Sequence, residues 1–203
     1  MKIIKILFFA IIISLNIFTP SFADDFKNWV ISFKEYAIKQ GISKKTLDKT
    51  MSKVEFLPNV IKYDRYQPEF YEDTNTYIKK RTNQKKIENF KKLFIKNSLL
   101  ILDIENEFDV EKELLLSLMG IETNFGKYLG KMDILSSLAT LSFDKRRSEF
   151  FTNELIIILK LIDSGIVDSD VLYGSWAGAF GNFQFMPSTI KNYALDYNND
   201  DLI

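Results

Sequence analysis

The chain has 203 residues, with 27 basic and 27 acidic side chains, and it contains neither histidine nor cysteine. Without those two residue types it lacks the ligands of the usual zinc sites, the base of a Ser-His-Asp triad and any cysteine nucleophile. The balanced charge gives no indication of nucleic-acid binding. Acid–base chemistry near neutral pH must therefore fall to Asp, Glu, Lys or Tyr.

The first 23 residues have the pattern of a secretory signal peptide. Lys2 and Lys5 form a basic start, residues 6–17 are almost wholly apolar, and residues 21–23 (Ser-Phe-Ala) suit a cleavage site. An uncleaved anchor is the alternative, but the apolar run is shorter than the ~20 residues of a membrane span. Since no cysteine is available for acylation, a lipoprotein anchor is excluded. We expect cleavage, leaving 25 basic against 27 acidic residues and no stable membrane anchor.

Apolar residues recur at helical spacing at the start of the mature chain. Phe26 to Ala37 predicts a first helix, with Gly41 as its stop. Ser43 is placed to cap a second short helix that runs to Met51. The stretch from Val54 to Tyr71 is punctuated by two prolines and has only weak periodicity. We therefore expect a helical region over residues 24–82 with an irregular second half.

The rest of the chain is also predicted to be helical. One long pattern covers residues 83–108, and a second helix is expected over 110–123 with Asp109 as its N-cap. Shorter helices are expected over residues 134–141, 146–164 and 187–193. No convincing run of alternating strand residues occurs, so the fold class is mainly α, with residues 83–203 as the main body.

Six of the eight glycines fall into two short patches, at residues 120–130 and 174–181. The first patch holds Glu122, one and two turns from Leu118 and Leu115 if residues 110–123 are helical. This spacing predicts that Glu122 lies in an apolar stripe, where an ionised carboxylate is costly and a protonated one, as a general acid requires, is favoured. A helix end that turns Glu122 to solvent or pairs it with Lys127 is the alternative.

The second patch, residues 174–189, reads GSWAGAFGNFQFMPST. Its small residues permit close approach of a ligand, Gln184 offers a two-way amide, and four aromatic residues could stack on sugars. The glycine spacing is wrong for a dinucleotide or phosphate loop. The alternative is a buried junction between loop and helix, with the aromatics (Trp176, Phe180, Phe183 and Phe185) in the core.

Taken together, these segments resemble the lytic murein transglycosylase B family. The matching segments are Met119–Gly126, Ala139–Phe143 with Arg146-Arg147, Gly174–Ala179 and Gln184–Ser188, with Tyr63–Phe70 upstream. Several independent motifs agree, in the right order, over roughly Phe26 to Ile203.

The resemblance implies a lysozyme-like α+β core and a periplasmic enzyme that acts on peptidoglycan strands without a required cofactor. The family cleaves between N-acetylmuramic acid and N-acetylglucosamine and leaves 1,6-anhydromuramoyl ends. The resemblance also implies that Glu122 serves as acid and then as base, and that Ser175 and Gln184 line the saccharide groove. One glutamate suffices because the substrate's own N-acetyl oxygen and 6-hydroxyl supply the other groups.

The last residues resemble the start of a calcium loop. The first, third and fifth ligand positions and a backbone carbonyl would come from Asp196, Asn198, Asp200 and Leu202. Asp201 replaces the usual glycine and no acid follows at position twelve, so a solvated acidic terminus is the alternative.

Three hypotheses about function follow. The family continues beyond residue 203, so the chain is expected to be truncated at its C-terminal side, and a non-catalytic peptidoglycan-binding remnant is one alternative to an active transglycosylase. A hydrolytic muramidase is the other, with Asp133 or Asp144 as a candidate second carboxylate. Partners among other cell-wall enzymes are not indicated.

Overall fold

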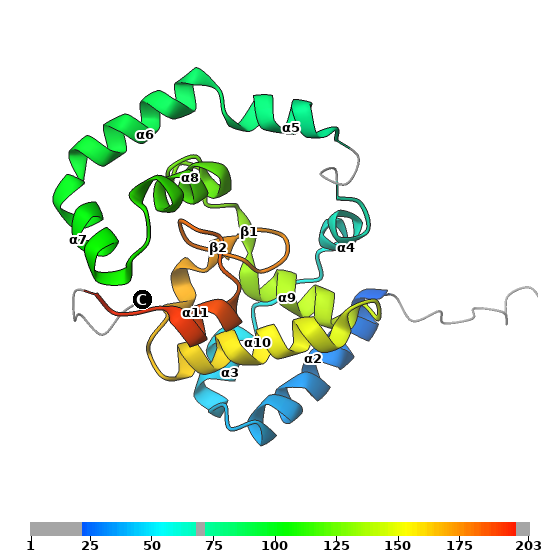
Figure 1. The fold of residues 1–203 in the computed structure, drawn as a ribbon. Coiled ribbons are helices and arrows are strands. Elements are labelled where there is room, and N and C mark those ends of the chain that lie inside the picture. Colours follow the sequence, from blue (N-terminus) through cyan, green and yellow to red (C-terminus); the bar gives the residue numbers. More distant parts are fainter. Residues whose placement is uncertain (1–21, 68–71, 198–203) are drawn as a thin grey trace, which may run out of the picture.

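A computed structural model describes residues 22–67 and 72–197 (Figure 1). Apart from its last two residues, the predicted signal peptide lies outside this part of the chain, as does most of the predicted calcium loop. Among the described residues, no helix combines the length and apolar character needed to cross a membrane.

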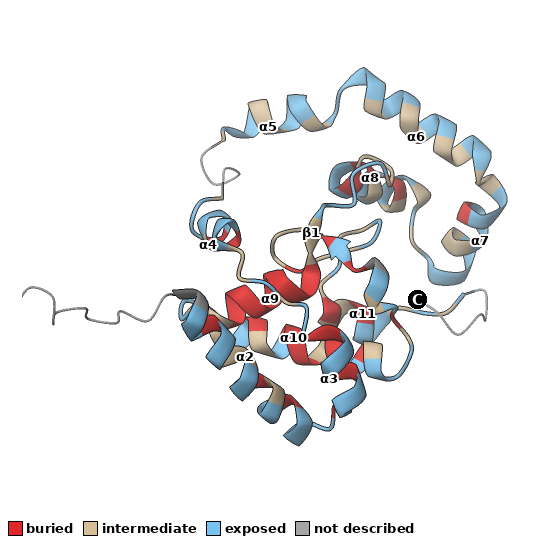
Figure 2. Ribbon diagram, turned by 180° about the vertical axis from the view of Figure 1, so that it is seen from behind, coloured by how far each residue is buried: buried red, intermediate tan, exposed pale blue. Residues whose placement is uncertain are grey.

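Helix α9, Ile134–Phe143, lies at the centre of the molecule, and residues 134–142 are all buried (Figure 2). Asp133 begins it by accepting a hydrogen bond from the Ser136 amide at 2.7 Å. Its hydroxyls also hold an incoming segment, since Ser136 Oγ accepts from Glu55 N and Thr140 Oγ1 from Leu57 N, each at 3.0 Å. Ser136 and Thr140 can therefore lie in this buried helix because their hydroxyls have hydrogen-bond partners, whereas the buried Ser137 hydroxyl has none among the described residues.

Three helices pack on α9 and form the core with it, namely α2 (Phe22–Lys39), α4 (Pro58–Arg65) and α10 (Ser148–Asp163) (Figure 1). Helices α3 (Lys44–Thr50) and α11 (Pro187–Tyr193) pack on α10. Aromatic residues of α2, of α9 and of the segment before α4 close one end of this core. The ring centroid of Phe26 lies 5.4 Å from that of Phe56 and 5.5 Å from that of Phe143. Residues from both sides of position 83 share one buried cluster. A domain boundary near residue 83 stays a prediction.

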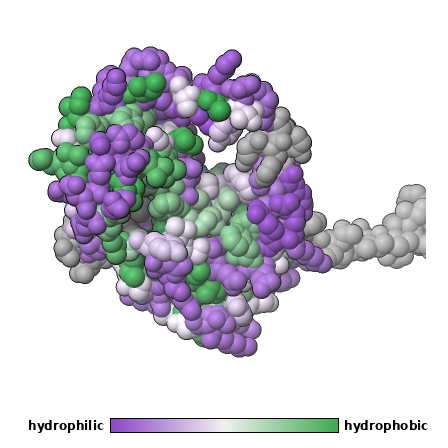
Figure 3. All heavy atoms as spheres, viewed as in Figure 1, coloured by the Kyte–Doolittle hydropathy of each residue, from purple (hydrophilic) through white to green (hydrophobic). Residues whose placement is uncertain are grey.

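Three further helices form an arc around α8, Lys112–Thr123 (Figure 1). They are α5 (Thr74–Arg81), α6 (Gln84–Lys96) and α7 (Ser98–Phe108). Neither α5 nor α6 has a buried residue, in contrast to α9 (Figure 2). On the face of Figure 3, hydrophilic residues follow much of the outer side of the arc and hydrophobic residues gather toward the middle.

A two-stranded antiparallel sheet lies between α8 and α9 (Figure 1). Strand β1, Met132–Asp133, pairs with β2, Tyr173–Gly174, with Met132 opposite Gly174. A short 3-10 helix, η2 (Ser169–Val171), precedes β2. The mainly α fold class is confirmed.

Several predicted helices are confirmed, namely α2, α3, α9, α10 and α11. The single long helix over residues 83–108 is wrong. Asn97 interrupts it, because its backbone leaves the helical region, with φ −124° and ψ 29°, and its side chain donates to Leu93 O at 3.1 Å. Asp109 is not an N-cap: it ends α7 in the left-handed conformation, with φ 52°. The weak periodicity of residues 54–71 concealed α4, and α5 lies beyond that stretch, where no separate helix is predicted.

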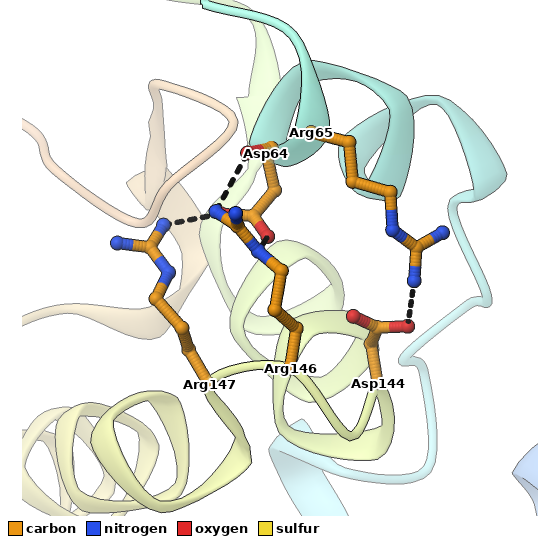
Figure 4. Close-up of polar contacts among 5 residues, drawn as sticks. All are labelled: Asp64, Arg65, Asp144, Arg146 and Arg147. Atoms are coloured by element: carbon orange, nitrogen blue, oxygen red, sulfur yellow. Dashed lines mark hydrogen bonds and ion pairs between the residues drawn. The ribbon is translucent and has the colours of Figure 1, made fainter.

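Two sequence motifs far apart in the chain meet at Asp64 of α4 (Figure 4). The side chain of Asp64 is 1% exposed and accepts from Arg146 Nε at 2.7 Å, and Arg147 also donates to it. Arg146 reaches the Asp64 backbone carbonyl at 2.8 Å as well, and Arg65 pairs with Asp144 at 2.7 Å. Burial opposes ionisation of Asp64, but the bonds from Arg146 and Arg147 outweigh it and hold its pKa below the ordinary 3.8.

Asp64→Asn is expected to lower the free energy of unfolding by about 2–3 kcal/mol, because it removes the charge that two arginines share. A lowered pKa stabilises the fold above the unfolded value of 3.8, and this contribution is lost as pH falls through the lower folded value. Urea unfolding between pH 3 and 7 should therefore show less loss of stability on acidification in the variant than in the parent.

Asp48→Asn is the matched control, since Asp48 also accepts from a cation, Lys34 at 2.8 Å, but its side chain is 52% exposed. An exposed pair contributes under about 1 kcal/mol. Equal losses in the two variants would contradict a structural role for burial at Asp64.

Candidate active site

Glu122 lies in the last turn of α8, followed by a tight turn. Asn124, Phe125 and Gly126 all have left-handed backbone conformations, with φ of 50°, 61° and 76°. The Phe125 amide donates to Met119 O at 3.1 Å, which closes the helix. Consecutive left-handed residues of this kind are costly and persist only where surrounding contacts fix them.

Thr123 supplies such contacts. Its side chain is fully buried, and its hydroxyl donates to Asn182 O at 2.8 Å and accepts from the Gly126 amide at 3.0 Å. The Thr123 carbonyl accepts from the Tyr128 amide at 2.9 Å. The residue next to Glu122 thus fastens the end of α8 to the second glycine patch, residues 174–189.

The glycines of the first patch allow this close approach. A Cβ on Gly120 would lie 2.7 Å from the ring of Phe125, and one on Gly126 would lie 2.8 Å from Asn182 Oδ1. Both contacts are too close for a side chain. The glycines at residues 120 and 126 are therefore required by close packing.

Ser175 lies inside the second patch and organises it. Its Oγ accepts from the amides of Ala177 at 3.3 Å and Ala179 at 3.0 Å, and its own amide donates to Ala179 O at 2.8 Å. A Cβ on Gly174 would lie 2.2 Å from Ala179 O. Ser175 therefore shapes the loop, and its half-buried side chain is already occupied by backbone donors.

Gln184 holds two loops together. It has a left-handed backbone, φ 50°, and its Nε2 donates to Leu129 O and Gly181 O, each at 3.0 Å. Leu129 belongs to the loop after Glu122, so the amide links the two patches. The side-chain carbonyl oxygen of Gln184 has no hydrogen bond with another described residue.

The aromatic residues of the second patch divide into two groups. Trp176 and Phe180 pack against the core, as the alternative of a buried junction predicted. Phe183 and Phe185 instead stack on each other at 5.8 Å between centroids, and Phe185 is 46% exposed. Of the four aromatic residues, Phe185 is the one that is exposed, and the other three are half-buried.

Glu122 itself is exposed, so the prediction that it lies within an apolar stripe of the core is wrong. The buried face of α8 is formed by Leu116, Gly120 and Thr123, and Leu118 is 44% exposed. The alternative pairing with Lys127 is not made either: Lys127 Nζ lies 3.4 Å from Asn89 Oδ1. The Glu122 side chain has no hydrogen bond or ion pair with any other residue that the structure describes.

Sequence reasoning missed Thr123, Asn182 and Glu154. Glu154 lies in the apolar run of α10, is 4% exposed and accepts from the Ser188 amide at 2.9 Å, so it anchors the start of α11. A carboxylate within an apolar run was the signal applied to Glu122, and it describes Glu154 better.

The predicted calcium loop is only partly within the described chain. Asp196 is half-buried, and Asn198, Asp200 and Leu202 lie outside the described residues. Within residues 22–67 and 72–197, no three His, Cys, Asp or Glu side chains cluster as metal ligands would.

Gln184→Ala is expected to weaken glycan binding more than stability. Two carbonyls lose a donor, which costs about 1–2 kcal/mol in unfolding free energy, and the only unpartnered polar atom of the side chain is also removed. Thermal unfolding and titration with a peptidoglycan fragment would measure the two effects. A variant that no longer folds would instead make Gln184 a structural residue.

Comparisons with known proteins agree on one family. Residues 25–203 match the model described as "Transglycosylase SLT domain". The chain is 44% identical over 94 residues to the membrane-bound lytic murein transglycosylase B of Escherichia coli (strain K12), covering 46% of this chain and 26% of that protein.

Two solved structures are similar over most of the chain. SltB3 from Pseudomonas aeruginosa in complex with NAG-NAM-pentapeptide gives a TM-score of 0.83 at 30% identity, over 87% of this chain and 47% of that one. Escherichia coli Slt35 in complex with calcium gives 0.74 at 31% identity, over 86% and 56%. The chain thus spans about half the length of these structures and a quarter of the curated relative.

Proposed function

The chain belongs to the transglycosylase SLT domain family, and from that premise we propose that it is a peptidoglycan lytic transglycosylase. It cleaves the bond between N-acetylmuramic acid and N-acetylglucosamine and forms 1,6-anhydromuramoyl ends. The observation that carries this proposal is the setting of Glu122. Its carboxylate is exposed and unpaired among the described residues, yet Thr123 beside it is buried and fastened to the loop of Ser175 and Gln184.

Glu122 acts in two steps. It first donates a proton to the glycosidic oxygen as the bond from that oxygen to C1 of the muramic acid breaks. The 6-hydroxyl oxygen of the same sugar then bonds to C1 and returns its proton to the Glu122 carboxylate. No water is consumed, and the glutamate ends in its starting state.

The surroundings of the two other candidate carboxylates favour this route over hydrolysis. Asp133 accepts from the Ser136 amide at the start of α9, and Asp144 pairs with Arg65 at 2.7 Å. An inverting or double-displacement glycosidase needs a second carboxylate free to act on water or on C1. Both candidates are already engaged in structural contacts.

Gln184 and the exposed Phe185 are the residues we assign to glycan binding, the first through its side-chain carbonyl and the second through ring stacking. Ser175 shapes the loop that carries them. The glycan strand would lie along the end of α8, against residues 174–185.

Two finer features accompany the proposal. Secretion to the periplasm through a cleaved signal peptide places the chain at its substrate, and protein sequencing of the mature N-terminus tests it.

A calcium site formed by Asp196, Asn198, Asp200 and Leu202 offers the oxygen ligands that calcium prefers. Slt35, a relative, has been solved with calcium, and calorimetric titration with CaCl2 tests the site here.

Mass spectrometry of muropeptides released from isolated peptidoglycan tests the proposed reaction. Products lighter by one water, with anhydromuramoyl ends, are expected from the purified chain. Reducing ends would make the chain a hydrolase. Binding of glycan without release would make it a non-catalytic peptidoglycan-binding protein.

A further inference from the structure

Lys86 joins the arc of helices to the end of α8 that carries Glu122. Helix α6 packs on α8 (Figure 1), and Lys86 lies in the first turn of α6, where Asn83 Oδ1 accepts from the Lys86 amide at 3.1 Å. The Lys86 side chain crosses to α8, and its Nζ donates to Gly120 O at 2.9 Å. The two residues are 34 positions apart in the chain, so this bond is a tertiary contact between two helices.

The Gly120 carbonyl can accept from Lys86 because α8 ends in a tight turn. Carbonyls in the last turn of a helix lack an intrahelical amide partner. Here the Asn124 amide, which would bond to Gly120 O in a continuing helix, donates to Met119 O instead. A lysine at this end also interacts favourably with the helix dipole. Lys86 therefore serves as a C-terminal cap of α8 that another helix supplies.

The surroundings of Lys86 make this bond more than a surface contact. Lys86 shares a cavity of about 300 Å³ between α6 and α8 with apolar residues of both helices, among them Ile87, Phe90 and Ile121. Burial, with a smaller contribution from Arg81, lowers the pKa of Lys86. An ammonium group that has lost part of its water depends on the acceptor that remains, which is Gly120 O.

The place of the Glu122 carboxylate depends on bonds of this kind. The Glu122 side chain has no hydrogen bond or ion pair with another described residue, so the backbone of the last turn alone positions it. That backbone is held on both sides of Glu122, by the bond from Thr123 to Asn182 O at 2.8 Å and by the bond from Lys86 to Gly120 O. A displacement of about 1 Å at a reacting group can lower a rate by about 100-fold.

We propose that Lys86 is a positioning residue for the transglycosylase reaction. It holds Gly120, and with it the last turn of α8, where the Glu122 carboxylate reaches the glycosidic oxygen. This inference rests on the proposed function, since it takes Glu122 as the acid and base. Lys86 itself touches neither the substrate nor the reacting atoms in this role, and the arc of helices contributes to turnover through it.

Lys86→Met tests the role, because it keeps an apolar side chain of similar length and removes the donor. With soluble glycan strands as substrate, kcat for anhydro product is expected to fall by about 10- to 100-fold. KM should change by less than about threefold, because Gln184 and Phe185 lie in a different segment. Lys86→Arg restores a cationic donor and should recover kcat to within about threefold of the parent.

The matched control is Lys92→Met, which removes the same charge from an exposed position of α6. Its kcat and KM should equal those of the parent. Urea unfolding of each variant establishes that the rates are those of folded protein.

A second comparison repeats Lys86→Met in a Glu122→Gln background. A residue that acts through Glu122 should cause a further loss of less than about twofold there. A general loosening of the fold would instead lower the rate by the same factor in both backgrounds.

An active parent whose folded Lys86→Met variant keeps the parent's kcat would overturn the positioning role and leave the proposed reaction intact. Equal losses in the two backgrounds, or a Lys86→Met variant that does not fold, would make Lys86 a residue of the fold alone and would also overturn the role. A folded parent that releases no anhydro product would overturn the proposed reaction, and the positioning role with it.

Discussion

Glu122→Gln is expected to reduce release of anhydromuropeptides by roughly 10²- to 10⁴-fold, the usual contribution of a general acid–base group. The amide has nearly the same shape but can neither donate the proton to the leaving oxygen nor accept one from the 6-hydroxyl. Because Glu122 is exposed and unpaired among the described residues, the substitution should change the unfolding free energy by no more than about 0.5 kcal/mol.

Glu113→Gln is the matched control, on the same helix and with its side chain 62% exposed. It loses only a surface contact with Lys112 at 3.4 Å, so its activity should equal that of the parent. Release rates from isolated peptidoglycan, together with glycan binding, measure both variants. Substantial turnover by Glu122→Gln would remove Glu122 from the mechanism.

Gly130→Ala is expected to destabilise the fold by about 3 kcal/mol or more, since two costs combine. The residue has φ 95°, in the region that side chains disfavour, and a Cβ there would lie 2.0 Å from Gly174 O and 2.2 Å from Gly174 C. The obstacle is the backbone of β2, which cannot rotate away as a side chain could.

Gly165→Ala separates the two costs. Gly165 has φ 80°, but a Cβ there would meet nothing within 4 Å, so it should show only the backbone cost of about 1 kcal/mol. Urea unfolding of both variants gives the difference. If the two variants lose the same stability, the contact between residue 130 and β2 is not a constraint on the fold.

Much of the fold could be predicted because apolar spacing and capping residues are local signals. Ser43 does cap α3, and the helices around Ile134 and Ser148 lie close to where their periodicity placed them. The break at Asn97 could not be predicted in this way, since apolar residues continue on both sides of it. Aspartate suits both ends of a helix. Only the backbone conformation of Asp109 shows that it ends α7 and does not begin α8.

The candidate site was predictable in part for the same reason. The two glycine patches do come together, through Thr123 and Gln184. The prediction that Glu122 is buried was wrong because apolar residues beside it are themselves largely exposed, Leu118 by 44% and Ile121 by 45%. A residue pattern identifies an apolar face but does not say whether other chain segments cover it. The meeting of Asp64 with Arg146 depends on tertiary structure alone.

The placement of α9 also bears on the order in which the chain folds. The contacts that hold the first described helices join residues distant in sequence: Glu55 to Ser136, Leu57 to Thr140 and Ser43 to Asp163, separated by 81, 83 and 120 positions. Contacts of such separation slow folding, because a long loop must close before they form. Helices α2 and α3 therefore have no core to join until α10 has been synthesised. A nascent chain of this design can complete the core around α9 only in the later part of its translation.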